Sequence, residues 1–112
     1  MQPPDETDWR VLVPYDVREG LSLRKAAERA GKSETTLRNW CVQHGLGRRV
    51  GDGVWVVSKI ALAMYLDGDA KALSLYRNGD RTSEVVKAYF DRCGVPLPFI
   101  SAQSAKSAKT AV

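Results

Sequence analysis

The chain has 112 residues, 44% of them hydrophobic, and a net charge of +4. These values favour one globular domain with a core of its own. No apolar run reaches the roughly 18 residues of a membrane span, and the acidic first residues do not predict a signal peptide. Two cysteines, Cys41 and Cys93, and one histidine, His44, are too few for a structural zinc site. We therefore expect two free thiols and neither a metal nor a cofactor.

The basic residues are unevenly distributed along the chain. Residues 1–20 contain two basic and five acidic residues, residues 21–59 contain eight basic and three acidic residues, and residues 60–100 contain five of each. A local excess of positive charge is typical of a surface that faces phosphates. A solvated basic face with no partner has the same composition and stays open as the alternative.

Three short segments precede the basic region. Residues 1–8 are polar and proline-rich and are expected to be disordered. Residues 9–13 contain an apolar run that stops at Pro14 and predicts a short strand or an extended arm on the core. Residues 15–19 can form a short helix that Gly20 ends. We expect this helix to support the two that follow.

Two short helices joined by a tight turn are predicted next, over residues 23–30 and 34–44. Ser22 and Ser33 are suited to cap their first turns, and Gly31 is suited to end the first helix. The apolar residues at helical spacing are Leu23, Ala26, Ala27, Ala30, Leu37, Trp40 and Cys41. These residues are expected to face the core, where the two helices would cross.

The second helix is expected to present a polar row on its outer side. Because the apolar residues face inward, the 100° step of a helix turns the remaining residues outward. The outward residues are Thr35, Arg38, Asn39 and Val42. Arg38 can pair with guanine and Asn39 with adenine, while an apolar group can touch the methyl group of thymine. Lys32 and Ser33 at the helix N-terminus can hold a phosphate. An ordinary helical hairpin with a polar surface is the alternative.

The two predicted helices carry a small residue, a glycine, an aliphatic residue and an aromatic residue at fixed spacing: Ala27, Gly31, Leu37 and Trp40. This pattern resembles the signature of helix-turn-helix DNA-binding proteins. The sequence of residues 21–27 is similar to the beginning of the motif in many bacterial members. The resemblance covers residues 21–40 and implies that the second helix binds DNA.

A β-hairpin is predicted over residues 48–57, because Asp52-Gly53 suits a tight turn and the flanking valines favour strands. Ser58 then caps a helix over residues 59–67, which Gly68 ends. A hairpin followed by a capped helix resembles the winged helix-turn-helix of MerR-type and phage excisionase-type proteins.

The resemblance implies that the hairpin is a wing on the DNA backbone or in the minor groove. The basic residues that match this role are Arg48, Arg49 and Lys59. Asp52 at the tip departs from a purely basic wing and argues against deep insertion into the minor groove. A structural cover over the core is the alternative for the hairpin, and Trp55 is expected to be a core residue.

The rest of the chain carries structural signals. Helices are predicted from apolar stripes around residues 72–76 and 85–93, with breaks near Asn78-Gly79 and at Gly94. The stripe Val85, Val86, Tyr89 and Phe90 either completes the core or presents a face to a second subunit. An extended piece over residues 95–100 and a disordered basic tail over residues 101–112 are expected.

The predicted fold is mainly α, a winged helix-turn-helix with a small two-stranded hairpin and additional C-terminal helices, over residues 9–100. We expect a sequence-specific duplex DNA-binding protein of bacterial or phage type, located in the cytoplasm with the nucleoid. It would act as a transcriptional regulator or as an excisionase-like architectural factor in DNA recombination. A small terminase-type packaging subunit, or an interaction adaptor that has lost DNA binding, is the alternative. Self-association on DNA as a dimer or head-to-tail oligomer is also expected.

No serine, cysteine or histidine stands in a context typical of a catalytic set, so we expect neither enzymatic activity nor a small-molecule ligand. The residues expected to contact DNA are Ser22, Lys25, Lys32, Ser33, Thr35, Thr36, Arg38, Asn39, Val42, Arg48, Arg49 and Lys59.

Overall fold

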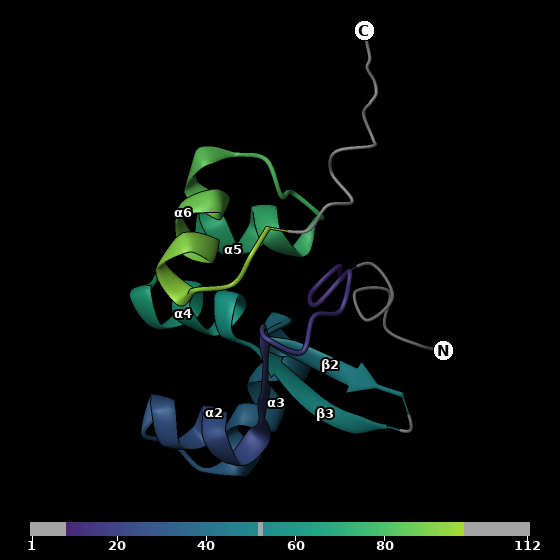
Figure 1. The fold of residues 1–112 in the computed structure, drawn as a ribbon. Coiled ribbons are helices and arrows are strands. Elements are labelled where there is room, and N and C mark those ends of the chain that lie inside the picture. Colours follow the sequence, from purple (N-terminus) through teal and green to yellow (C-terminus); the bar gives the residue numbers. More distant parts are fainter. Residues whose placement is uncertain (1–8, 52, 98–112) are drawn as a thin grey trace, which may run out of the picture.

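The computed structural model describes residues 9–51 and 53–97. Within them the protein is a mixed α/β globule, mostly helical, with five helices and a three-stranded antiparallel sheet. The elements are β1 (Gly20–Ser22), α2 (Leu23–Ala30), α3 (Glu34–His44), β2 (Gly47–Val50), β3 (Val54–Ser58), α4 (Lys59–Asp67), α5 (Ala70–Arg77) and α6 (Glu84–Cys93). Figure 1 shows α4, α5 and α6 at one end, α2 and α3 at the other, and the β2–β3 hairpin projecting to the side.

Three helices begin and end at the predicted residues, because their signals are local. The hydroxyl of Ser22 accepts a hydrogen bond from the N–H of Lys25, and Ser33 does the same for Thr36. Ser58 begins α4 in this way and accepts from two backbone N–H groups. Such caps satisfy donors that the first turn of a helix leaves unpaired.

The helix predicted over residues 15–19 is wrong. This segment forms two turns instead, in which the N–H of Glu19 donates to the carbonyl of Asp16 at 2.9 Å and the N–H of Gly20 donates to that of Val17 at 3.3 Å. Gly20 then enters β1 and pairs with Ser58 of β3. A pairing partner 38 positions along the chain, which no local pattern reveals, therefore decides the conformation here.

The sheet has the strand order β1-β3-β2, so the hairpin strand β3 lies in the centre. In the hairpin, Arg49 pairs with Trp55 and Gly47 pairs with Val57. The prediction of a two-stranded hairpin is correct for β2 and β3 but misses β1. Asp52 of the predicted turn lies outside the described residues, as do residues 1–8 and 98–112, on which the predictions of two disordered ends depend.

The core joins both ends of the molecule. Its largest fully buried side chains are Leu12, Leu37, Leu46, Val57, Ile60, Leu62, Met64, Tyr76, Val86 and Phe90. Trp40, predicted to lie in the core, is half-buried and packs at its margin with a ring-centroid distance of 4.7 Å to Tyr65. None of the helices in the described ranges is long and apolar enough to cross a membrane.

The stripe on α6 belongs to this core. Val86, Tyr89 and Phe90 are buried, and Val85 is half-buried against the same cluster. The chain's own packing covers three of these residues and part of Val85, which favours the core over the alternative of a face for a second subunit. Val95 is also buried, at the start of the segment predicted to be extended.

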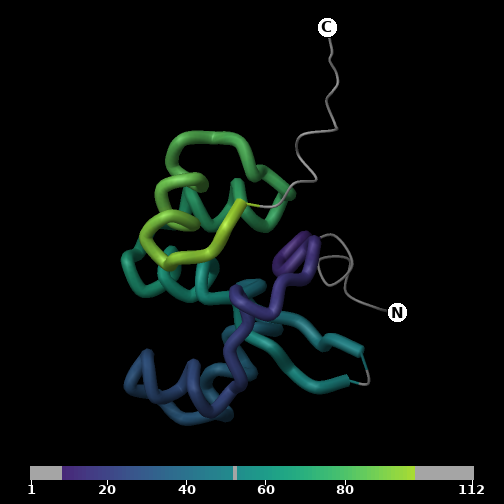
Figure 2. The backbone as a smooth tube through the Cα atoms, in the orientation of Figure 1, coloured from purple at the N-terminus to yellow at the C-terminus, as the bar shows by residue number. Residues whose placement is uncertain are grey.

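The segment before β1 ties the two ends of the molecule together. It forms no strand, and Val11 and Leu12 are buried in the core. The N–H of Leu12 donates to the Tyr76 hydroxyl at 2.8 Å, and the Arg81 guanidinium donates to the carbonyls of Arg10 and Val13. Figure 2 shows this N-terminal segment passing between the base of the hairpin and the C-terminal helices.

A buried carboxylate completes this connection. Glu19 is only 3% exposed, and its carboxylate accepts hydrogen bonds from the hydroxyls of Ser58, at 2.5 Å, and Tyr76. Burial raises the pKa of Glu19, while those two hydrogen bonds and the positive charge of Arg81 oppose the shift. We call Glu19, Ser58 and Tyr76 the buried triad.

The raised pKa of Glu19 gives a pH-dependent stability. The folded chain binds the Glu19 proton more tightly than the unfolded chain, so protonation of Glu19 stabilises the fold. This stabilisation is complete below the ordinary glutamate pKa and is lost as pH rises through the folded-state pKa. We expect the free energy of unfolding of the wild type to fall, relative to that of Glu19→Gln, as pH rises from the ordinary glutamate pKa through the folded-state pKa. Urea unfolding of both proteins at a series of pH values measures the difference, and parallel curves would contradict it.

Candidate nucleic-acid interface

The α2–α3 pair is held at close range by small buried residues. Ala26 and Ala27 of α2 are buried, as is Leu37 of α3, and the connection between the helices is only three residues long. Gly31 ends α2 at φ 70°, a left-handed conformation that glycine adopts without cost. The N–H of Lys32 then donates to the carbonyl of Ala27 at 3.0 Å. The turn therefore sets the angle at which α3 leaves α2.

The predicted outer row of α3 is exposed in the structure. Leu37 and Cys41 are buried on the inner side of the helix. The exposed side chains are Thr35, Arg38, Asn39 and Val42. Val42 is 44% exposed, which is high for a large apolar side chain and places it on the surface beside the polar residues. The row thus offers an amide, a guanidinium, a hydroxyl and methyl groups to a partner.

Three predicted contact residues instead hold the helix ends. The hydroxyl of Ser22 caps α2, and the hydroxyl of Ser33 both caps α3 and donates to that of Thr36 at 3.0 Å. Thr36 is half-buried. These hydroxyls are engaged within the chain, so their main effect is to fix where α2 and α3 begin.

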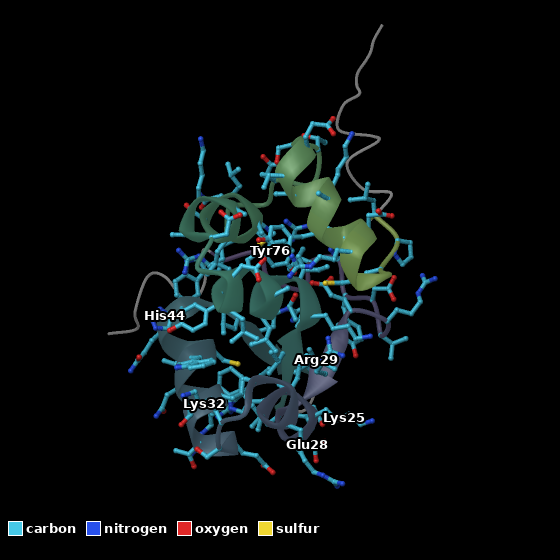
Figure 3. The ribbon with its side chains drawn as sticks, turned by 90° about the vertical axis from the view of Figure 1, so that its left-hand side faces the viewer. Lys25, Glu28, Arg29, Lys32, His44 and Tyr76 are labelled. Carbon is cyan, nitrogen blue, oxygen red and sulfur yellow. The ribbon has the colours of Figure 1, made fainter. Side chains whose placement is uncertain are left out.

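Positive charge gathers at the α2–α3 end of the molecule. Figure 3 shows Lys25, Arg29 and Lys32 there with a single labelled acid, Glu28. Glu28 forms an ion pair of 3.5 Å with Arg24, and both side chains are mostly exposed. Arg24 and Arg29 were missed in the sequence-based set, although their exposure follows from the amphipathic pattern of α2.

The three basic residues of the hairpin region have different environments. Arg49 is exposed and lies over the Trp55 ring, 5.4 Å from its centroid. Arg48 is half-buried, and its guanidinium donates to the carbonyls of Val11 and Leu12 at 3.0 and 2.9 Å. The structure therefore uses Arg48 to fasten the N-terminal segment to β2.

Lys59 lies at the base of the hairpin, away from its tip. It is the first residue of α4, and its N–H donates to the carbonyl of Glu19 at 2.9 Å. The register of the hairpin places Arg49 opposite Trp55, four positions before Lys59. Lys59 thus lies at the base of the hairpin and Arg49 near its tip.

The two cysteines and the histidine pack against other parts of the chain. Cys41 and Cys93 are free thiols, and burial raises the pKa of Cys41 to about 12. A thiol with such a pKa stays protonated and unreactive near neutral pH. His44 ends α3 and stacks on Tyr65 with a centroid distance of 4.9 Å. Among residues 9–51 and 53–97, no group of three His, Cys, Asp or Glu side chains lies close enough to hold a metal ion.

Comparison with family models, with curated proteins and with solved structures gave no match for this chain. The fold and the surface themselves therefore define the class: a small, mostly helical α/β globule whose α2–α3 pair and adjoining hairpin carry an exposed basic surface.

Proposed function

We propose that the protein is a winged helix-turn-helix protein that binds duplex DNA sequence-specifically, as a transcriptional regulator or an excisionase-like architectural factor. The observation that carries this proposal is the exposed row on α3, opposite the buried Leu37 and Cys41. A helix of 11 residues is about 16 Å long. It fits a major groove about 12 Å wide with its outer row toward the base edges.

The charges around α3 support the same orientation. Lys25 and Arg29 are exposed on α2, Lys32 is exposed in the turn before α3, and Arg49 is exposed on the hairpin. Basic residues on either side of a recognition helix contact the backbone phosphates and fix the register of the helix in the groove. In this arrangement Arg49 binds a phosphate beside α3, while Arg48 stabilises the hairpin through its hydrogen bonds to the N-terminal segment.

Alanine substitutions on α3 test the assignment of the recognition helix. A selection on random duplexes first identifies the preferred site. We expect Arg38→Ala and Asn39→Ala each to weaken binding to it by about 1–3 kcal/mol, because each removes a contact with a base edge. Fluorescence anisotropy with the labelled duplex measures the loss.

The matched control is Lys87→Ala on α6, at the far end of the molecule. Its ion pair of 3.5 Å with Glu84 is exposed, so its loss has little effect on stability. We expect this variant to bind like the wild type. Wild-type affinity in both α3 variants would remove α3 from the interface, and an affinity that does not fall with salt would argue against phosphate contacts altogether.

A further inference from the structure

A cavity of about 600 Å³ opens between the N-terminal segment, α3 and the hairpin. Trp9, Val42 and Trp55 contribute apolar surface to it, and Arg48 and Arg49 contribute charge. Its volume is within the range of sites that bind small organic ligands. The cavity lies beside the outer row of α3 but is a separate feature, since only Val42 of that row lines it.

The chemistry of the lining favours a flat anion. Two indole rings, from Trp9 and Trp55, provide faces or edges on which a planar ring can pack. In the part of the chain that the structure describes, no aspartate or glutamate lines the cavity, and the two charged residues that do are arginines. The Arg48 guanidinium is occupied by the carbonyls of Val11 and Leu12, so the exposed Arg49 is the group that remains to bind an anion.

The cavity walls are fixed by contacts from the rest of the fold. Arg77 of α5 lies over the Trp9 ring at 4.8 Å, and its carbonyl accepts a hydrogen bond of 2.7 Å from the N–H of Arg10. Gly45 lets the indole approach α3, because a Cβ there would be 2.6 Å from the ring. The C-terminal helices therefore place Trp9 at the cavity, and a ligand meets a wall that is already formed.

We propose that this cavity binds a nucleotide, with the base packed between the indoles and the phosphate held by Arg49. A nucleotide combines a planar ring with an anionic group, and arginine binds phosphate through paired N–H donors. The nucleotide can be free or part of an unpaired strand. Because Val42 and Arg49 also belong to the proposed DNA surface, an occupied cavity competes with duplex binding.

Nuclear magnetic resonance of the three indole N–H groups tests this proposal on the full chain and without duplex DNA. We expect AMP to shift the signals of Trp9 and Trp55 saturably and to leave that of Trp40, which does not line the cavity, unchanged. Adenosine and ribose 5-phosphate, which each lack one half of the ligand, are expected to bind at least about tenfold more weakly. If a single-stranded oligonucleotide produces the same shifts at a lower nucleotide concentration, the nucleotide that the cavity binds belongs to an unpaired strand.

Arg49→Gln is expected to weaken AMP binding by at least about tenfold, because a charge-assisted contact is lost. The matched control Arg24→Gln removes an exposed arginine outside the cavity and is expected to bind like the wild type. Equal AMP affinity in both variants, or no saturable shift with either AMP or the strand, would overturn the proposal. Since no step uses duplex DNA, this result is independent of whether α3 reads a DNA site.

Discussion

Glu19→Ala is expected to lower the free energy of unfolding by about 3 kcal/mol, because the hydroxyls of Ser58 and Tyr76 both lose their acceptor. A buried donor without a partner costs about 1–3 kcal/mol. The two hydroxyls lie 3.2 Å apart and can bond to each other, which recovers part of the loss for one of them. Urea unfolding monitored by circular dichroism measures the difference in midpoint.

The control for this variant is Glu28→Ala on α2. Its side chain is 67% exposed and pairs with Arg24, whose side chain is 79% exposed, so its removal is expected to change stability by less than about 0.5 kcal/mol. If the two alanine variants unfold at the same urea concentration, the buried triad does not connect the ends of the molecule as described.

Gly47→Ala is expected to destabilise the fold by more than about 3 kcal/mol. A Cβ at this position would lie 2.2 Å from the carbonyl oxygen of Val56 and 2.9 Å from the sulfur of Cys41. The first of these atoms belongs to the paired strand β3, so the added methyl group separates β2 from β3 or the hairpin from α3. Overpacking of this kind typically costs about 1–3 kcal/mol, and more where backbone must move.

Gly68→Ala separates this clash from the effect of losing a glycine. Gly68 ends α4 at φ 74° and has open space where a Cβ would stand. The cost of alanine there is therefore only that of the left-handed backbone conformation, about 1–2 kcal/mol. Differential scanning fluorimetry is expected to give Gly47→Ala a lower melting temperature than Gly68→Ala. The reverse order would mean that β2 can shift away from Val56 at little cost.

The helix boundaries could be predicted because their signals lie within a few residues of one another. Ser22 and Ser33 cap helices with their own hydroxyls, and Gly31 ends one with its own backbone. The outer row of α3 followed from the same local periodicity. Local chemistry thus accounts for the bounds of α2, α3 and α4 and for the exposure of the row.

Three of the misses involve partners far away in the sequence. β1 exists only because it pairs with β3, so residues 15–19 looked like a short helix when considered alone. Arg48 and Arg49 are adjacent and identical, yet the backbone of the N-terminal segment engages only one of them. The cavity likewise needs Trp9, which Arg77 of α5 holds in place.

The N-terminal segment has a consequence for synthesis of the protein. The carbonyls of Arg10 and Val13 leave the ribosome before their donor, Arg81, which is made about 70 residues later. The N-terminal segment therefore finds its partners only after Tyr76 and Arg81 have been made, so the nascent chain carries an uncovered Leu12 until then.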